Sequence, residues 1–444
     1  MTGVSRRTES GPGVLLYNPI SGHGHLDSWL VMFCEAVRAL GLNTAVLTPD
    51  PRPLERRGLL DDAGLWVADW KASGGNRLSR ARAWFSEREA AWVGGVPAVG
   101  PKQAVARAVF RAQHTARRGV GLARKIEAGE SEAGLLSPVE MAGRAAAAVG
   151  RSPFPIGMML HMYLDMFRRG PETWNGVDGL LGLPWCGIRF APAGPGGRET
   201  AWMDVVRSMR GLCVLDEGAA ARYRATGGDR FVEVLPDITD TRLPERPSPL
   251  AAAIRARACG RRVVLLAGSL DSRKNIGGFL RLAAGADPDR WCFAMVGRVY
   301  IETLDPRTRE ALEMVRRDTP SNLFLHGEFV EDEADLNAAV AGADVVFAVY
   351  TSFEHTSNLM TKAASFGTPL LVSDAALMGR LVREYEIGAA IGEDDVAAWR
   401  DALDRLVASP PALASFRRYL DRVDRGRLAE SLGAVIGACM GGAA

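Results

Sequence analysis

The sequence has little that would hold a metal ion or form disulfides. Its six cysteines form no Cys-x-x-Cys pair and have no histidine at ligand spacing. Neither a zinc site nor a disulfide framework is therefore expected. The charge is nearly balanced too, with a formal net charge of +2 at pH 7. Proteins that follow phosphate backbones concentrate far more lysine and arginine, so no nucleic-acid partner is expected.

Long apolar runs are also absent. No stretch approaches about 18 continuous apolar residues, the length needed to span a membrane. The polar start "MTGVSRRTESGPG" lacks the apolar core of a signal peptide. Together with the scattered cysteines, this predicts a cytoplasmic protein. The chain has 444 residues, 47% of them apolar and 24% charged, which is enough for two globular domains.

Strand-like apolar runs alternate with helix-period segments at both ends of the chain. This pattern predicts an α/β fold with two Rossmann-like doubly wound domains that face a cleft. Near the start, "GVLLYNP" and "NTAVLTP" predict strands on either side of an amphipathic helix that Gly41 ends. Residues 77–170 are rich in alanine and arginine at helical spacing, without clear strands, which predicts a helical insertion.

The Pro-rich segment 239–250 is the best candidate for a linker between the domains. It separates an N-terminal domain, 1–240, from a C-terminal domain, 250–410, in which runs such as "RRVVLLAGS" and "ADVVFAVY" predict strands. Residues 411–444 are predicted to form helices that return to the N-terminal domain. In such domains the chemistry is expected in the loops at the carboxyl ends of the strands.

The first such loop is "NPISGHGHLD", where Gly22 and Gly24 precede a helix. Glycine lets the backbone approach a ligand closely, and the amides and dipole of the helix favour an anion. The alternative is a plain turn between strand and helix. In the second loop, "GSLDSRKNIGGFL", Arg273 and Lys274 precede a helix and are placed to hold a diphosphate. A merely solvated pair is less favoured there, since the helix dipole repels cations at this end.

A third loop, "SFEHTSNLMTKAASFG", places Glu354, His355, Ser357 and Asn358 at the start of a helix that ends near Gly367. Uncapped amides, a hydroxyl and a carboxamide can bind phosphate oxygens, and a carboxylate beside them can accept hydrogen bonds from sugar hydroxyls. Helix capping alone would explain the serine and the asparagine. It does not explain the glutamate and the histidine, so the loop favours a sugar nucleotide.

Residues 263–392 resemble the C-terminal half of the retaining GT-B glycosyltransferases, a large bacterial group that transfers sugars from nucleotide-sugars. The family pattern is G-R-L-x-x-x-K, followed later by E-x7-E-A-x-x-x-G-x-P. Lys274 matches the phosphate-binding lysine and Glu354 the first glutamate, which meets the donor sugar, while Gly367 and Pro369 are also in register. The N-terminal half resembles the family more weakly, through "LLYNPISGHGH".

Two positions depart from the family pattern. Ser269 replaces the usual arginine, although Arg273 can reach the same diphosphate. Lys362 replaces the second glutamate, which in the family holds the nucleotide ribose. Lys362 follows Asn358 by four residues, so on a helix both share a face. A cation there favours phosphate over ribose, and we therefore count Lys362 among the donor-binding residues.

The resemblance implies transfer with retention of configuration, no metal and no cofactor other than the nucleotide-sugar donor. Lys274 and Glu354 are then catalytic candidates. His161 is a third, because "MMLHMYLDMF" places it four residues before Asp165, on one face if the segment is helical. The resemblance also places a histidine on the acceptor side near this point. A histidine in an apolar run is more often a core residue, so both interpretations stay open.

The acceptor is unknown from the sequence. Residues 102–125 carry seven basic and no acidic side chains, which allows peripheral contact with an anionic membrane or simply a solvated helical surface. Alternatives to the transferase within the same fold are an epimerase, a phosphorylase or a pseudo-glycosyltransferase. A non-catalytic GT-B binding protein is a further alternative, to which Ser269 and Lys362 point.

Overall fold

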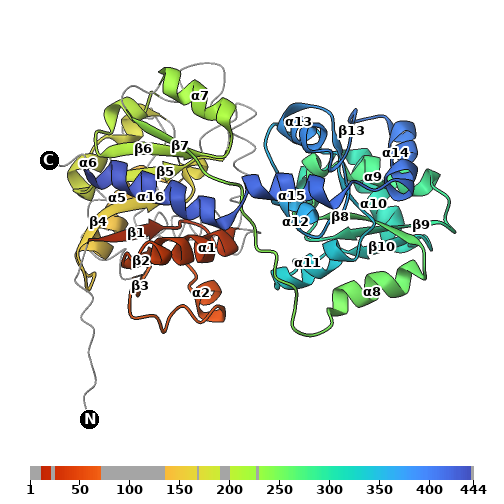
Figure 1. The fold of residues 1–444 in the computed structure, drawn as a ribbon, viewed down its shortest axis with the longest axis horizontal. Helices are drawn as coiled ribbons and strands as arrows, with labels where there is room; N and C mark the ends of the chain where they lie inside the picture. Colours follow the sequence, from red (N-terminus) through yellow and green to blue (C-terminus); the bar gives the residue numbers. More distant parts are fainter. Residues whose placement is uncertain are drawn as a thin grey trace, which may run out of the picture. The chain divides into compact units, whose positions relative to one another are not determined.

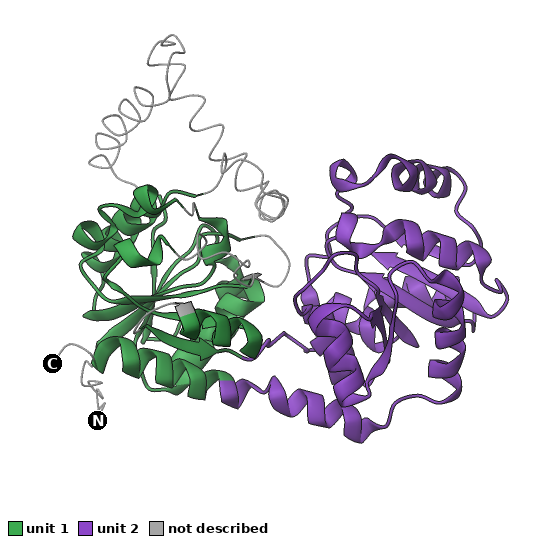
Figure 2. Cartoon of the chain, turned by 90° about the horizontal axis from the view of Figure 1, so that it is seen from above, with its two compact units in different colours: residues 1–235, 428–444 green, residues 236–427 purple. Residues whose placement is uncertain are grey.

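The computed structural model describes residues 12–21, 26–71, 136–167, 170–190, 201–226 and 230–441. The chain divides into two compact units (Figure 2): unit 1 comprises 1–235 and 428–444, and unit 2 comprises 236–427. The chain therefore passes between the units twice, once before Pro236 and once after Arg427.

Unit 1 is built on a parallel sheet with the order β3-β2-β1-β4-β5-β6-β7. Its strands are β1 (Gly13–Tyr17), β2 (Thr44–Leu47), β3 (Leu65–Ala68), β4 (Ile156–His161), β5 (Trp185–Ile188), β6 (Met209–Val214) and β7 (Phe231–Val234). Its described helices are α1 (Leu26–Ala39), α2 (Arg52–Arg56), α5 (Pro138–Val149), α6 (Val177–Leu181), α7 (Glu217–Thr226) and most of α16 (Arg425–Gly441). The chain thus returns to unit 1 in its last helix (Figure 1).

Strand β4 corrects the prediction for its part of the chain. Residues 156–161 fall in the stretch 77–170 that was predicted to be helical, yet they form a strand between β1 and β5. A short apolar run cannot be assigned by periodicity, because a fully buried strand is apolar at every position. Much of the predicted insertion, including 102–125, lies outside the described residues, as do Gly22 and Gly24.

Unit 2 has a six-stranded parallel sheet with the order β10-β9-β8-β11-β12-β13. Its strands are β8 (Arg262–Ala267), β9 (Trp291–Val296), β10 (Leu323–His326), β11 (Val345–Ala348), β12 (Leu370–Ser373) and β13 (Gly388–Ile391). Its helices are α8 (Pro249–Ala258), α9 (Ile276–Gly285), α10 (Pro306–Arg317), α11 (Glu333–Ala341), α12 (Asn358–Ser365), α13 (Ala376–Tyr385), α14 (Val396–Ala408) and α15 (Leu413–Arg422).

The core of unit 2 lies on both faces of its sheet, as the alternation along β8 illustrates. Val263 and Leu265 face one apolar cluster, which α8, α11, α12, α13 and α15 cover. Val264 and Leu266 face the other cluster, beneath α9 and α14. Successive side chains of a strand point to opposite faces, and helices on both faces make every strand position apolar. The predicted doubly wound α/β architecture is confirmed for each unit.

Candidate active site

The strand order of unit 2 places the candidate residues together. Strands β8 and β11 are neighbours, but the chain leaves them toward opposite sides of the sheet, to β9 and to β12. Ligands of open α/β sheets bind at such a switch point, outside the carboxyl ends of the strands. The loop 268–275 follows β8 and the loop 349–357 follows β11, and these two loops carry most of the predicted donor-binding residues.

The loop after β8 depends on two glycines at its base. Gly268 has a φ of +103°, in the region that side chains disfavour. A Cβ on Gly297, in the loop after β9, would lie 2.0 Å from the carbonyl oxygen of Gly268, so only glycine permits this approach. Beyond Gly268 the chain forms a single 3-10 turn, Ser272–Lys274, in which the buried Asp271 carboxylate accepts a hydrogen bond from the amide of Arg273.

Lys274 joins the two loops. Its side chain is only 7% exposed, and its Nζ donates a hydrogen bond to the hydroxyl of Tyr350, the residue two positions beyond β11. The Tyr350 hydroxyl also lies 3.4 Å from Oγ of Ser357. A lysine cation, a phenol and a serine hydroxyl thus form a chain of contacts across the switch point.

Arg273 lies beside Lys274 but is more exposed. Its guanidinium is 3.4 Å from the Asp271 carboxylate and its Cζ is 5.1 Å from the centre of the Phe353 ring. The carboxylate and the ring orient the guanidinium without burying it, since 31% of the side chain remains exposed. A planar cation held in this way suits the oxygens of a diphosphate.

The loop after β11 is held in an unusual backbone conformation. Ser352 has a φ of +49°, which costs a residue with a side chain free energy. Its amide donates to the carboxylate of Glu393, at 3.2 and 3.3 Å. The amide of Thr351 donates to the carbonyl of Arg273 at 2.9 Å. These bonds offset the strain and attach the loop to its neighbours.

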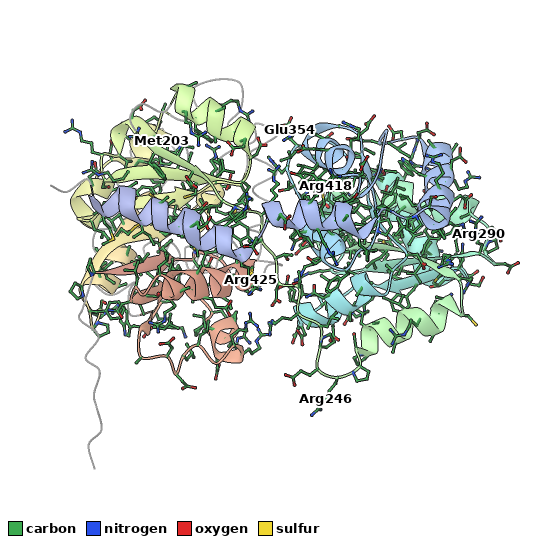
Figure 3. The ribbon with its side chains drawn as sticks, viewed as in Figure 1. Met203, Arg246, Arg290, Glu354, Arg418 and Arg425 are labelled. Atoms are coloured by element: carbon green, nitrogen blue, oxygen red, sulfur yellow. The ribbon has the colours of Figure 1, made fainter. Side chains whose placement is uncertain are left out.

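Glu354 follows this turn and is exposed; its position is labelled in Figure 3. Its neighbour His355 packs edge to face against Phe353, with the ring centres 5.5 Å apart. An exposed carboxylate on a loop that other residues anchor is available to accept hydrogen bonds from a ligand.

Helix α12 begins directly after these residues. Ser357 occupies the N-cap position, but its side chain makes no capping hydrogen bond, and Asn358 is the first helical residue. The first amides of a helix lack the carbonyl partners that later turns have, and with the dipole they favour an anion. In α12 the amide of Met360 donates to the carbonyl of Ser357. The structure therefore brings together six predicted residues, Arg273, Lys274, Glu354, His355, Ser357 and Asn358, at one edge of one sheet.

Lys362 does not join this group. Its Nζ donates to the carbonyl of Asp240 at 2.6 Å and to Oδ1 of Asn337 at 2.7 Å, and it lies 2.8 Å from the carboxylate of Glu333. These three partners use all three N–H donors of the ammonium, and the side chain is 1% exposed. The prediction that Lys362 binds the donor is therefore not supported. Lys362 does lie one helical turn after Asn358 on α12, as predicted. Its contacts with Asp240, Asn337 and Glu333, however, point the amine into the protein interior.

His161 lies in unit 1, at the end of β4, and it is fully buried. Rings of Tyr17, Phe167 and Trp185 surround it, and its Nδ1 accepts a hydrogen bond from the amide of Tyr163. Burial lowers the pKa of His161 from 6.5 to about 3, so the ring is neutral. This geometry supports the core role of His161 over the catalytic one.

Asp165 does not share a helix face with His161, the arrangement that had suggested a catalytic role. It is in a 3-10 turn, Leu164–Met166, rather than one helical turn beyond His161. Its carboxylate accepts from the amide of Phe190 at 2.8 Å and lies 3.6 Å from Arg189. The two residues therefore do not form a pair on one helix face, because β4 ends between them.

Four site residues were missed in the sequence: Asp271, Tyr350, Phe353 and Glu393. Tyr350 carried a signal, because it follows an apolar strand directly and so had to lie at the carboxyl edge of the sheet. Glu393 carried none, since it is 41 residues from Ser352 in the sequence. Among the described residues no cluster of histidine, cysteine and acidic side chains could hold a metal ion, and no helix is long and apolar enough to cross a membrane.

Residues 261–409 match the family described as "Glycosyl transferases group 1". The matched segment is similar to the group 1 glycosyltransferases over about a third of the chain. The matched segment lies within unit 2 and contains both loops of the candidate site. Among curated proteins, none has a sequence that matches this chain.

Solved structures share the fold of this chain at low sequence identity. HepE of Anabaena, solved with UDP and glucose, is 12% identical, with a TM-score of 0.62 over 96% of this chain and 100% of its own. Sucrose-phosphate synthase from Thermosynechococcus elongatus is 13% identical, with a TM-score of 0.60 over 96% and 98%. A glycosyltransferase from Rickettsia africae is 8% identical, with a TM-score of 0.58 over 97% and 98%. The chain therefore has the GT-B fold.

Proposed function

We propose that the enzyme transfers a sugar from a nucleoside-diphosphate sugar, bound by unit 2, to an acceptor that unit 1 recognises. The observation that carries the proposal is the grouping of Arg273, Lys274 and the first amides of α12 beside the exposed carboxylate of Glu354. Two cations and a helix N-terminus match a diphosphate, and the carboxylate matches the hydroxyls of the sugar attached to it. HepE, which shares the fold, has been solved with UDP-glucose.

The chemistry assigned to these residues follows from the charges that develop during transfer. Breaking the glycosidic bond places positive charge on the sugar ring and negative charge on the departing diphosphate. Lys274, Arg273 and the α12 amides stabilise the departing diphosphate, since preorganised donors act where charge develops. Glu354 orients the sugar. Retention, with a phosphate oxygen of the leaving group taking the acceptor proton, is part of the proposal on the strength of the family resemblance.

The test is a panel of nucleoside-diphosphate sugars, with the shift in melting temperature as the binding measurement and release of free nucleotide as the activity measurement. We expect at least one donor to raise the melting temperature and to release nucleotide when an acceptor is supplied. Glu354→Ala should abolish turnover while UDP still binds. If no nucleotide-sugar binds, the proposal is overturned.

One observation favours a second candidate, a GT-B protein that binds a nucleotide-sugar without transferring the sugar. The family glutamate that holds the ribose is replaced by Lys362, and the amine of Lys362 is used within the protein. Product analysis separates the two candidates. Donor that remains unchanged after long incubation with varied acceptors, despite measurable binding, would favour the binding protein.

A further inference from the structure

The first passage of the chain from unit 1 into unit 2, residues 236–242, is attached directly to α12. We call these residues the connection. Thr361 Oγ1 donates to the carbonyl of Asp237 at 3.2 Å, and Lys362 Nζ donates to the carbonyl of Asp240 at 2.6 Å. Asp237, Asp240, Thr361 and Lys362 are all buried. Two successive residues of α12 thus hold two points of the connection.

Helix α11 strengthens this attachment through Asn337. Its Nδ2 donates to the carbonyls of Asp240 and Arg242, at 3.0 and 2.8 Å, and its Oδ1 accepts from Lys362. Asn337 is fully buried. The connection has no helix or strand of its own, so these bonds to α11 and α12 fix its path.

The carboxyl group of Asp237 contacts the loop 349–357, which we call the donor loop. It shares a hydrogen bond with the side chain of Thr356, the residue between His355 and Ser357. Burial raises the pKa of Asp237 to about 6, while this hydrogen bond and the nearby Arg422 oppose the increase. A carboxyl group buried at this cost needs a compensating interaction, and its partner belongs to the loop that carries Glu354.

The second passage between the units is attached to the same place. Tyr419 of α15 places its hydroxyl 3.1 Å from Thr361 Oγ1. Because the Thr361 hydroxyl hydrogen goes to the carbonyl of Asp237, Tyr419 is the donor in this bond. Helix α15 ends at Arg422, and the chain enters unit 1 after Arg427. Thr361, one turn behind the N-terminus of α12, thus contacts the first passage and the helix that precedes the second.

We propose that the connection positions the donor loop and α12 for nucleotide-sugar binding, with Asp237 and Thr361 as positioning residues. The inference rests on the proposed function of the site. It goes further because it assigns roles to two residues that are not proposed to touch the nucleotide-sugar. Residues that bind a ligand must be held to within about 0.5 Å of their productive positions by the residues that pack against them. The bond between Asp237 and Thr356 holds the end of the loop 349–357, and the bond from Ser352 to Glu393 already holds its middle.

The proposal has a reciprocal consequence. If an ordered connection improves donor binding, then a bound nucleotide must stabilise the connection by the same free energy. Nucleotide binding should therefore slow amide hydrogen exchange at 238–242, although these residues lie outside the proposed contacts with the ligand. Donor binding and the order of the passages between the units would then be coupled.

The chain offers a matched pair of variants for the test. Thr361 and Thr368 are each 3% exposed. Thr361 donates to the carbonyl of Asp237 at 3.2 Å, and Thr368 donates to the carbonyl of Val340 at 3.1 Å. Thr361→Val and Thr368→Val each remove one buried hydroxyl with little change of shape. Only the first removes a bond to the connection, and it also removes the bond with the Tyr419 hydroxyl.

We expect both variants to lose thermal stability, Thr361→Val more because the Tyr419 hydroxyl also loses its partner, and to differ in function. Thr361→Val should raise the dissociation constant of UDP, and KM for the donor, by about tenfold, with a smaller change in kcat. Thr368→Val should match the wild type in both. Asp237→Asn and Thr356→Val should act in the same direction as Thr361→Val, and their double variant should be no worse than either alone. Equal effects of Thr361→Val and Thr368→Val on UDP binding would overturn the proposal.

Hydrogen exchange without ligand keeps this test independent of the proposed function. In the full-length protein, Thr361→Val should speed exchange at residues 353–358 relative to the wild type, whereas Thr368→Val should not. This comparison needs no nucleotide. If amide hydrogen exchange at 353–358 is unchanged in Thr361→Val, the positioning role is contradicted even if the enzyme binds UDP. A failure of UDP to bind the wild type, with exchange altered as expected, would instead count against the proposed donor.

Discussion

The ammonium of Lys274 donates a hydrogen bond to the hydroxyl of Tyr350, and this contact joins the loops after two adjacent strands. Each residue comes from a different βα unit, 76 residues apart in the sequence. The contact fixes a lysine that would otherwise move on four rotatable bonds. It places the positive charge at the switch point of the sheet, next to the N-terminus of α12.

Removing only the Tyr350 hydroxyl should therefore weaken donor binding. In Tyr350→Phe the ring remains, but the lysine loses the partner that holds it, a hydrogen bond to a charged group worth about 1.5–3 kcal/mol. We expect the affinity for UDP to fall by about tenfold or more, measured by calorimetry. Tyr385→Phe, whose ring packs on Tyr419, is the control and should bind UDP normally. Equal affinity in both variants would contradict the role of the hydroxyl.

Restoring the family residue at position 362 should destabilise the protein. In Lys362→Glu a buried carboxylate would face the carbonyl of Asp240, the Asn337 side chain and the Glu333 carboxylate. Breaking a buried ion pair costs about 3–5 kcal/mol, and repulsion adds to this, so urea unfolding should show at least that loss. Arg290→Met is the control (Arg290 is labelled in Figure 3), because its ion pair with Asp404 is half exposed and should contribute at most about 1 kcal/mol. If Lys362→Glu is stable and more active than the wild type, the contacts of Lys362 with Asp240, Asn337 and Glu333 are not needed for the fold.

His161 should make stability depend on pH without affecting catalysis. The folded protein keeps the ring neutral, with a pKa of about 3, whereas the unfolded chain binds a proton below about 6.5. Stability is therefore lost as the pH falls from 6.5 toward 3, by about 1.4 kcal/mol per pH unit. In His161→Asn the difference in unfolding free energy between pH 7 and pH 4.5 should shrink by about 3 kcal/mol. The pH profile of kcat should not move, and a profile that loses a limb in this variant would restore the catalytic role.

Asp237 should act on stability in the opposite sense. Its pKa is raised from 3.8 to about 6 by burial, so the folded state binds the proton more tightly than the unfolded chain. Its contribution favours folding at low pH and is lost as the pH rises from 3.8 to 6, by about 3 kcal/mol in all. Compared with the wild type, Asp237→Asn should gain relative stability at pH 7 over pH 4 in urea unfolding. The same pH dependence in variant and wild type would contradict a raised pKa.

The sequence alone predicted those features of the structure that depend on residues close together in the chain. The apolar runs predicted the strands β8 to β12. The spacing of Glu354, Ser357 and Asn358 predicted the start of α12, and Arg273 and Lys274 were correctly placed before α9. These features depend on periodicity and on capping, which act over a few residues. The carboxyl ends of parallel strands then meet at one edge, so the grouping of these loops followed as well.

Some short strands were harder to predict. Strands β3, β4 and β13, which were not predicted, have four to six residues each. The segment of β4 is apolar at nearly every position, and a buried strand and a buried helix look alike in such a run. Only pairing with β1 and β5 made it a strand.

The sequence by itself determined which residue types stand at the ends of the strands of unit 2, and with them the chemistry the site can offer. The tertiary structure alone decided which of the predicted side chains are available. Lys362 and His161 both matched a functional pattern, yet one meets a carbonyl 122 residues away and the other is enclosed by three aromatic rings. Burial and partners come from distant segments packing together, and no periodicity along the chain encodes them.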